Sequence, residues 1–302
     1  MKPFFSVIIP TYNRAEILKK AIDSVLAQTF NDYEILVMDD GSTDNTRETV
    51  ESFHDFRIYY HWAENSGGPA TPRNRGIEAA QADWICFLDA DDLWYPDKLK
   101  ILSETINSFP DIDLFCHNEM LFHIKTGRRT LLKHGPDSAD IYRIMLMEGN
   151  RVSTSATTVR RSFLNKYALR FNQSSDYVIV EDYDMWLRIA CFGGQYHFIS
   201  DICGEYIIDT DNISSDYKKM RHNHEVLLKD HVYYLQTFEQ DKNRLWGKIN
   251  ARLLLGDSLY LFRSKKILSG ISLLLQSIQS SPIGFIAYIN SNLAARLCNY
   301  ID

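Results

Sequence analysis

The sequence predicts an α/β protein with a mostly parallel sheet flanked by helices and a C-terminal helical extension. In the first hundred residues, short apolar segments bounded by turn residues alternate with segments whose apolar residues recur at helical spacing. Such strand–helix–strand repetition produces parallel sheets with helices on both faces. From about residue 216 onward the pattern is helical only. We therefore expect one domain in residues 1–215 and a helical extension in residues 216–302.

Four strands are expected in the first part, because each segment is short, mostly apolar and followed by turn residues. They are residues 5–10, 33–39, 57–62 and 84–89. Helices are expected at about residues 14–28, 43–53, 69–82 and 96–107. Asn13 followed by Glu16 predicts a capping box at the first helix, and Pro96 is expected in the first turn of the fourth.

Beyond residue 110 the periodicity is weaker. Residues 113–124 are expected to form another strand and residues 181–193 another helix. The segment NRVSTSATTVRRS, residues 150–162, is rich in Ser and Thr and ends in basic residues. It is interpreted either as a structural strand or as part of an acceptor site.

Composition excludes some classes of function and location. The formal net charge of −6 argues against a nucleic-acid partner, which would normally require a basic surface. The five cysteines include no CxxC pair, so neither a zinc site nor a disulfide framework is predicted. Free thiols suit a reducing compartment, and the first apolar stretch is too short for a secretory signal. We expect a cytoplasmic protein.

The C-terminal extension contains an uncharged segment, from Ile267 to Ala295, directly after the basic residues Arg263, Lys265 and Lys266. Two interpretations are open. The segment forms a pair of packed helices, or residues 260–302 make peripheral contact with the inner face of a membrane.

Acidic side chains follow two of the expected strands. Asp39 and Asp40 end the second, and Asp89 and Asp91 end the fourth. Ligands of parallel sheets bind at the carboxyl ends of strands, so four acids would share one crevice if these strands pair. A hard divalent cation, Mg²⁺ or Mn²⁺, would relieve their repulsion and attract a nucleotide diphosphate. Helix caps and turns are the alternative use of Asp40 and Asp44.

Five segments resemble the motifs of family 2 glycosyltransferases in order and spacing. They are VIIPTYNR, DDGSTDNT, NSGGPATPRNRGIEAA, FLDADDLWYPDKL and EDYDMWLR, and the resemblance covers about residues 4–215. It implies a GT-A fold with a Rossmann-like sheet, a nucleotide-sugar donor, a divalent metal ion and inversion at the anomeric carbon.

The resemblance also implies roles on the donor side. Asp39 would accept a hydrogen bond from the base, Arg73 would face the diphosphate or sugar, and Asp91 would be the more direct metal ligand. The residues implied to bind nucleotide or donor are Pro10, Thr11, Tyr12, Arg14, Asp39, Asp40, Arg73, Asp89 and Ala90. The implied metal ligands are Asp89, Asp91 and Asp209.

On the acceptor side, the resemblance implies that Asp182 is the catalytic base, with Glu181 beside it, and that Trp186 borders the acceptor. Neighbouring side chains on a helix point about 100° apart, so one of the two acids is expected to face the cleft. Glu181 remains the alternative base.

Two departures from the family pattern stand out. Pro72 replaces the usual Ala before Arg73, so the helix is expected to start late. The segment YIID, residues 206–209, stands where many relatives carry Tyr-Arg-x-His. Asp209 would then replace the metal-binding His, and Ile207 removes a positive charge.

The leading hypothesis is an inverting, metal-dependent glycosyltransferase that takes a sugar from a nucleotide diphosphate, UDP being the commonest in the family. Its acceptor would be a glycan or a lipid-linked hydroxyl in bacterial surface polysaccharide synthesis. A sugar nucleotidyltransferase is the second hypothesis, but PTYNRAE lacks the expected Gly-rich loop. A non-catalytic nucleotide-sugar-binding subunit is the third, and the presence of Asp89, Asp91 and Asp182 argues against it.

Overall fold

The computed structural model describes residues 2–208 and 217–298, with side chains described as far as Asn290. The chain divides into two compact units. The first consists of residues 1–141 and 151–224, and the second of residues 142–150 and 225–302.

One sheet of nine strands forms the centre of the described part of the first unit, in the order β3-β2-β1-β4-β8-β6-β9-β5 with β7 beside β6. The pairings among β1 to β4 are parallel, as is β6 with β9, whereas β5, β7 and β8 pair antiparallel. The α/β class is therefore confirmed, with antiparallel strands entering after β4. The strands are β1 (Phe5–Thr11), β2 (Tyr33–Asp39), β3 (Ile58–Trp62), β4 (Trp84–Phe87), β5 (Leu93–Trp94), β6 (Leu114–His123), β7 (Arg128–Leu132), β8 (Thr157–Arg160) and β9 (Tyr196–Ile208).

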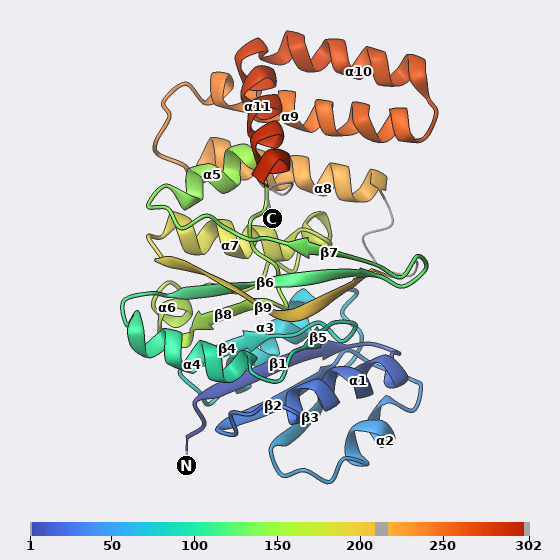
Figure 1. Cartoon of the computed structure of the whole chain (residues 1–302), viewed down its shortest axis with the longest axis vertical. Helices are drawn as coiled ribbons and strands as arrows, with labels where there is room; N and C mark the ends of the chain where they lie inside the picture. Colours follow the sequence, from blue (N-terminus) through green and yellow to red (C-terminus); the bar gives the residue numbers. More distant parts are fainter. Residues whose placement is uncertain (1, 209–216, 299–302) are drawn as a thin grey trace. The chain divides into compact units, whose positions relative to one another are not determined.

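Helices cover both faces of the parallel part of this sheet (Figure 1). The core on one face joins β1, β2 and β4 to α1 (Ala15–Leu26) and α4 (Lys98–Ser108). On the other face, α3 (Ala70–Ala79) approaches β1 so closely that a Cβ on Gly76 would meet Ile8 at 2.5 Å. Trp186 of α7 (Glu181–Cys191) packs there against Phe87, with ring centroids 6.0 Å apart. Burial on both faces explains why these strands are almost wholly apolar.

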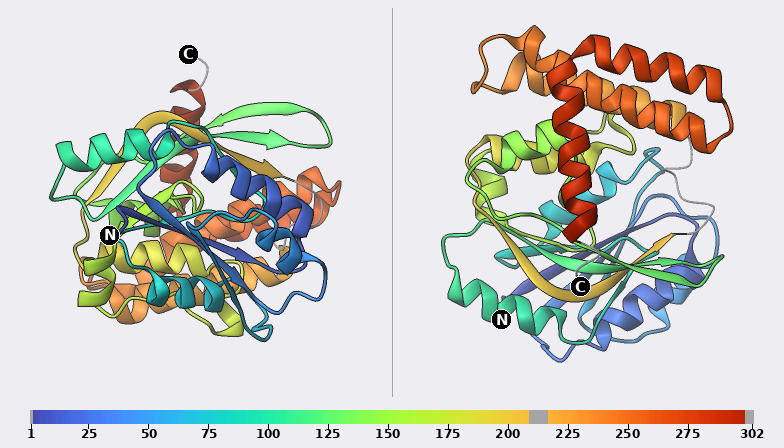
Figure 2. Two further views of the ribbon diagram at one scale, coloured as in Figure 1. Left: turned by 90° about the horizontal axis from the view of Figure 1, so that it is seen from below. Right: turned by 45° about the horizontal axis from the view of Figure 1, so that its top comes forward.

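Shorter elements complete the first unit. They are α2 (Thr46–Glu51), α6 (Arg161–Lys166) and the 3₁₀ turn η1 (Ser175–Tyr177). Strands β6 and β7 form a long hairpin (Figure 2), and β6 stays paired with β9 as far as His123.

The expected capping box at the first helix is wrong. Asn13 has a left-handed backbone (φ +50°), and its Oδ1 accepts a hydrogen bond from the Thr43 amide at 2.8 Å. The first helical amide, Ala15 N, instead donates to Asp44 Oδ2 at 3.2 Å. Asp44 thus has the capping role that the sequence left open for it, and it serves two helices, because its Oδ1 also accepts from the amide of Thr46 at the start of α2 at 3.1 Å.

Two helix starts also differ from expectation. Helix α3 begins at Ala70 and does not start late, because Pro72 lies in its first turn, where a backbone N–H has no partner within the helix. Helix α4 begins at Lys98, so Pro96 precedes it instead of lying in its first turn.

The second unit is helical, as expected for the extension. It contains most of α5 (Ile141–Glu148), the later part of α8 (Tyr217–Asp230), the π-helix η3 (His231–Leu235), α9 (Lys242–Arg263), α10 (Ile267–Ser280) and α11 (Pro282–Cys298). Helix α10 packs back on α9 as a hairpin (Figure 1).

In residues 2–208 and 217–298, no helix combines the length and the apolar composition required to cross a membrane. The four cysteines with described side chains are free thiols.

Candidate active site

The loop after β4, residues 88–92, carries three aspartates and is called the acidic loop below. Asp92 is buried and fixes the loop from within. Its carboxylate accepts hydrogen bonds from the Ser155 hydroxyl at 2.5 Å and from the Ile207 amide at 2.9 Å. The Asp89 amide donates to the same Ser155 hydroxyl at 3.0 Å. Asp92 therefore holds the loop against β9, which leaves Asp89 and Asp91 to face outward.

Asp89 and Asp91 are each paired with an arginine. Arg73 Nη2 lies 2.6 Å from Asp89 Oδ1, and Arg14 Nη1 lies 2.6 Å from Asp91 Oδ2. The two aspartate side chains keep 29% and 24% of their surface exposed. Burial and the neighbouring Asp89 raise the pKa of Asp91, while Arg14 opposes the rise. Both acids thus already attract cations.

Arg73 joins three segments of the first unit. Its side chain is buried in α3, and Nη1 donates to Glu181 Oε1 at 2.8 Å while Nη2 contacts Asp89. Its guanidinium lies over the Phe171 ring, 5.3 Å from the centroid. Burial lowers the pKa of Arg73, but Asp89 and Glu181 raise it further, so the group stays charged. Arg73 therefore bridges α3, the acidic loop and the start of α7.

Asp182, in the first turn of α7, has a different environment from Glu181. Its Oδ2 accepts a hydrogen bond from the Thr154 hydroxyl at 3.2 Å and its Oδ1 from the Tyr183 amide at 2.7 Å. Burial and the charge of Glu181 raise the pKa of Asp182 to about 7. Burial also raises the pKa of Glu181, and the charge and hydrogen bond of Arg73 oppose that rise, whereas the hydrogen bonds to Asp182 come from neutral donors. Asp182 is thus the better placed of the two to exchange a proton.

A second acidic group lies at the end of β2. Because β1 separates β2 from β4, the four acids do not share the single crevice that pairing of those strands would have produced. Asp39 is fully buried and accepts hydrogen bonds from the Ser42 amide at 2.8 Å and the Tyr60 hydroxyl at 2.5 Å. Asp40 accepts from the Ser66 amide at 3.0 Å. Tyr60 and Ser66 were not predicted as partners of these acids, although Ser66 lies in the segment NSGGPATPRNRGIEAA, because both contacts join segments that are distant in the sequence.

The end of β1 lies between these two acidic groups. Pro10 and Thr11 are buried, and the Thr11 hydroxyl has no hydrogen-bond partner within the described part of the chain. Tyr12 is 48% exposed. An unpartnered buried hydroxyl beside an exposed aromatic ring is a suitable surface for a nucleoside. Ala90, in the acidic loop, is buried.

Tyr206 of β9 is a further site residue that the sequence reasoning missed. Burial and then the charges of Asp92, Asp89 and Asp182 raise the pKa of its phenol. The side chain therefore lies near both the acidic loop and the candidate base. Its position at the start of YIID is the signal that would have identified it. Asp209, three residues later, lies outside the described residues.

Comparison with known families settles the class of this protein. The family model described as "Glycosyl transferase family 2" matches residues 6–167, more than half of the chain. The chain belongs to glycosyltransferase family 2.

Two curated relatives of this family 2 glycosyltransferase are similar over most of its length. An uncharacterized glycosyltransferase of Rickettsia typhi is 30% identical over 252 residues, which cover 80% of this chain and 68% of the relative. The UDP-Glc:alpha-D-GlcNAc-diphosphoundecaprenol beta-1,3-glucosyltransferase WfgD of Escherichia coli is 30% identical over 233 residues, 74% of this chain and 84% of the relative.

Solved structures support the fold. Residues 1–349 of TarS from S. aureus, in complex with UDP-GlcNAc, superpose with a TM-score of 0.66 at 21% identity, covering 94% of this chain and 83% of that chain. The mannosyltransferase PcManGT from Pyrobaculum calidifontis, in complex with GDP-Man and Mn²⁺, gives a TM-score of 0.60 at 17% identity, with 98% and 81% covered. The GT-A fold expected from the sequence is thereby confirmed.

Family 2 membership raises the question of whether these residues fit a divalent metal ion. In residues 2–208 and 217–298, no group of three or more His, Cys, Asp and Glu side chains forms a metal site. Asp89 and Asp91 nevertheless supply two adjacent, partly exposed carboxylates, and their repulsion favours a cation. Mg²⁺ and Mn²⁺ commonly bind through one or two carboxylates and complete their shell with phosphate oxygens and water. The donor set therefore fits such an ion together with a diphosphate.

Trp186, which the resemblance places beside the acceptor, is part of the packed interior of the first unit. Its side chain is fully buried and packs against Phe87 and Phe171. It offers no surface to an acceptor in this structure, because the hydrophobic face of α7 that carries it turns toward the sheet. Trp186 therefore packs α7 against the sheet, and its role beside an acceptor stays a prediction.

Proposed function

We propose that this chain transfers a sugar from a nucleotide diphosphate, with a UDP-sugar as the first candidate, to a hydroxyl of a glycan or lipid-linked acceptor. The reaction inverts the anomeric carbon. The observation that carries the proposal is the contrast at the start of α7. Glu181 is bound to Arg73 at 2.8 Å, whereas Asp182 has neutral hydrogen-bond donors and a pKa near 7.

In the proposed reaction Asp182 accepts the proton of the acceptor hydroxyl as the oxygen attacks the anomeric carbon. The new C–O bond forms as the bond to the diphosphate breaks on the opposite side, which inverts the centre. Thr154 and the Tyr183 amide orient the carboxylate of Asp182 for this step. Glu181 does not act as the base, because its charge is used in the pairing with Arg73.

On the donor side, Asp89 and Asp91 would hold Mn²⁺ or Mg²⁺, which when bound offsets the charge that grows on the leaving diphosphate. Arg14 Nη1 lies 2.6 Å from Asp91 Oδ2. Its positive charge would therefore lie beside the proposed metal ligand and would attract the phosphates of the donor. Thr11, Tyr12, Asp39 and Asp40 would bind the nucleoside.

The donor and acceptor classes are supported by what similar proteins bind. WfgD of E. coli is named as using UDP-Glc and an acceptor linked to diphosphoundecaprenol, and TarS was solved with UDP-GlcNAc. PcManGT, solved with GDP-Man, keeps GDP-sugars as candidates. We propose a place in bacterial surface polysaccharide synthesis, with a reducing cytoplasm suited to the free thiols.

The test is a turnover assay with UDP-Glc, UDP-GlcNAc, GDP-Man and a dTDP-sugar, each with Mn²⁺ and a lipid-diphosphate-GlcNAc acceptor. The proposal predicts acceptor-dependent release of one nucleoside diphosphate and a product of inverted configuration by NMR. Release of pyrophosphate from a nucleoside triphosphate and a sugar 1-phosphate would instead identify a nucleotidyltransferase. Tight donor binding without turnover on any acceptor would favour a non-catalytic subunit.

A further inference from the structure

The helical hairpin of α9 and α10 packs through small and polar residues. Ser277 of α10 donates its hydroxyl proton to the Ala251 carbonyl of α9 at 2.5 Å. Ser258 of α9 donates to the Gly270 carbonyl of α10 at 2.8 Å. A Cβ on Gly270 would meet the Phe262 ring at 2.6 Å, so a larger residue there would require that ring to shift. Gly270 and Ser277 are the two fully buried residues of α10.

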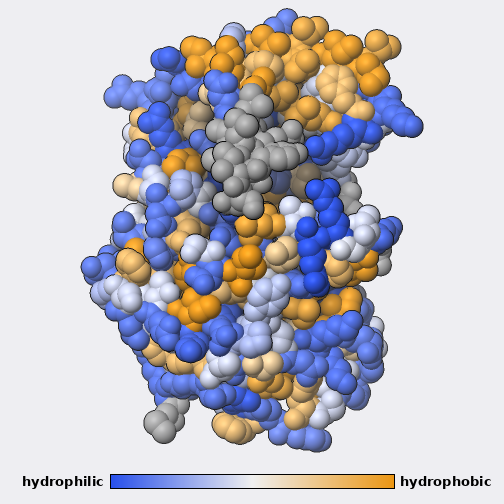
Figure 3. Space-filling model, in the orientation of Figure 1, coloured by the Kyte–Doolittle hydropathy of each residue, from blue (hydrophilic) through white to orange (hydrophobic). Residues whose placement is uncertain are grey.

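Several large apolar side chains of α10 are exposed instead, whereas Leu273 and Leu274 are half-buried. Leu268 is 85% exposed, Ile271 44%, Leu275 55% and Ile278 37%, at spacings of three and four residues that place them on one face. Helix α11 begins in the same manner. Its Gly284 packs closely on Lys248 of α9, whereas Ile283 and Ile286 are exposed. We call the following six residues the apolar face: Leu268, Ile271, Leu275, Ile278, Ile283 and Ile286. Figure 3 shows hydrophobic residues gathered over α10.

This arrangement is the reverse of a helix in water. A surface helix in water turns its apolar stripe toward the core and its polar residues outward. Small residues at a helix–helix contact with large apolar residues facing outward are typical of helices surrounded by lipid. Removal of exposed apolar side chains of this size from water is favourable, so an apolar partner that covers the face is favoured.

The charges beside the apolar face indicate which partner covers it. From Ser258 to Ile301 the chain has no Asp or Glu. Arg263, Lys265 and Lys266 lie exposed at the turn between α9 and α10. Basic residues close to an anionic membrane surface are attracted to it electrostatically. A second copy of the chain would carry the same basic charges and no acidic groups in this segment to pair with them.

We propose that the apolar face docks on an anionic phospholipid surface. Helix α10 lies in the plane of the interface with its leucines and isoleucines among the acyl chains, while the basic turn contacts the lipid phosphates. The helix lies on the membrane and does not span it, in agreement with its 14 residues. This inference rests on the helical unit alone and does not depend on the proposed reaction.

The test is flotation of the full chain with vesicles of phosphatidylcholine containing 30% phosphatidylglycerol, compared with phosphatidylcholine alone. We expect the wild type to float with the anionic vesicles and to be released by about 0.5 M salt, which shortens the screening length to a few ångströms. The double variant Leu268→Glu, Leu275→Glu should bind at least tenfold more weakly. Both positions are exposed, so the variant keeps its fold, which its circular dichroism and melting temperature check.

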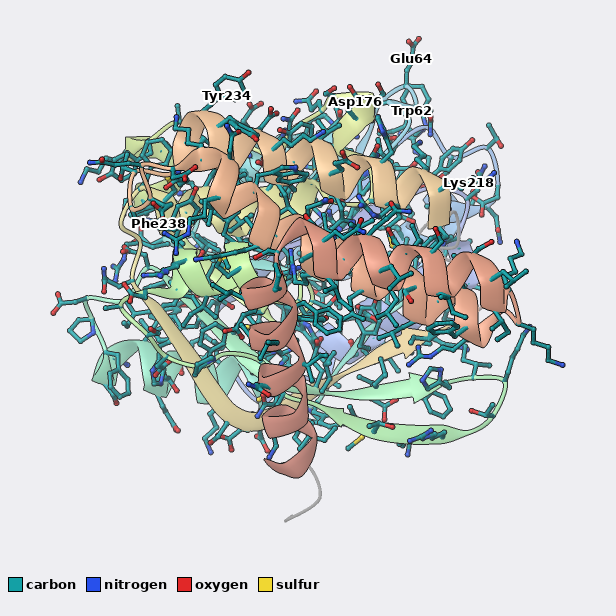
Figure 4. All side chains as sticks on the ribbon, turned by 90° about the horizontal axis from the view of Figure 1, so that it is seen from above. Trp62, Glu64, Asp176, Lys218, Tyr234 and Phe238 are labelled. Atoms are coloured by element: carbon teal, nitrogen blue, oxygen red, sulfur yellow. The ribbon has the colours of Figure 1, made fainter. Side chains whose placement is uncertain are left out.

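A matched control carries the same change of charge outside the apolar face. Phe56 and Tyr234 are 87% and 80% exposed, and Figure 4 shows Tyr234 extending away from the ribbon. The variant Phe56→Glu, Tyr234→Glu should float like the wild type. Absence of wild-type flotation, or equal loss in both double variants, would overturn the proposal. A wild-type dimer in light scattering that becomes a monomer in Leu268→Glu, Leu275→Glu, without vesicle binding, would assign the face to self-association.

Discussion

Two adjacent carboxylates in the first turn of α7 have opposite electrostatic surroundings. Arg73 donates to Glu181, whereas Asp182 receives hydrogen bonds from the Thr154 hydroxyl and a backbone amide. The motif that contains them was recognisable in the sequence, but it left both acids as candidates for the base. The distinction depends on Arg73 and Thr154, which lie 109 and 28 positions away from Asp182, so no local pattern could have supplied it.

Replacing Asp182 by Asn tests its role as the base. We expect kcat to fall by about 10²–10⁴, the usual contribution of general base catalysis, with donor affinity unchanged by calorimetry. Asp176→Asn is the control, because Asp176 is an exposed acid outside the site. If Asp182→Asn kept turnover within about twofold of the wild type, the base would have to be a different group.

The pH dependence of the reaction follows from the same carboxyl. With a pKa of about 7, Asp182 is protonated and inactive in acid and becomes the base as the pH rises. We expect kcat/KM to increase about tenfold per pH unit below pH 6 and to level off above about pH 8. A rate profile that stayed flat between pH 5.5 and pH 8, in a chain that remained folded, would contradict this assignment.

The free energy of unfolding should fall as the pH rises, whereas the reaction rate should increase. The folded pKa of Asp182 lies above its ordinary value of 3.8, so the ionised form is disfavoured in the folded state and stability is lost as the pH rises from about 4 through 7. Asp182→Asn removes this effect. It should raise Tm by several degrees at pH 8 and leave it nearly unchanged at pH 4, as measured by differential scanning calorimetry. A lower Tm at pH 8 would show that the hydrogen bonds to the carboxylate outweigh its burial.

At the level of elements, α3 positions the site through Arg73. Arg73→Met leaves Glu181 buried without its cation, and breaking a buried pair in this way costs about 3–5 kcal/mol. Urea denaturation should show this loss. Arg170→Met is the matched control, because Arg170 lies 3.9 Å from an exposed Glu78, and we expect a change below about 1 kcal/mol there. Equal stability of the two variants would mean that the bridge by Arg73 is not needed to hold α3, the acidic loop and α7 together.

Close packing of α3 on β1 gives a second test at this level. Gly76→Ala would bring its Cβ to 2.5 Å from Ile8, and such overpacking costs about 1–3 kcal/mol. Gly256→Ala, in α9, meets no atom within 4 Å and should stabilise the chain by about 0.5–1 kcal/mol. Urea denaturation of both variants measures the difference. Similar effects of the two substitutions would contradict the close contact between α3 and β1.

The periodic pattern identified strands β1 to β4 and the helices between them because each buries a regular apolar face. It did not identify their lateral order or the cap of α1. The order β3-β2-β1-β4 and the hydrogen bond from Ala15 to Asp44 both depend on contacts between segments that are separate in the sequence. Asn13 and Glu16 matched a local capping signal, but Asn13 instead bonds to Thr43 in the same distant loop.

At the scale of the whole molecule, the fold class and the family could be predicted from the sequence because several motifs occur in the expected order. The division into two units could not be predicted. Residues 142–150 join the helical unit, although their sequence continues directly from the α/β unit. The exposure of the apolar side chains of α10 could not be predicted either. An amphipathic pattern shows that a helix has an apolar and a polar face, but not which of the two packs against the rest of the protein.

The proposed function depends on the binding of a nucleotide diphosphate to the acidic loop through a divalent ion. The most direct measurement is calorimetric titration of UDP, GDP and dTDP into the wild type and Asp91→Asn, each with and without Mn²⁺. We expect one of the three nucleotides to bind the wild type when Mn²⁺ is present. This binding should be lost when Mn²⁺ is left out and in Asp91→Asn. Equal affinity with and without Mn²⁺, or an unchanged affinity in Asp91→Asn, would contradict it.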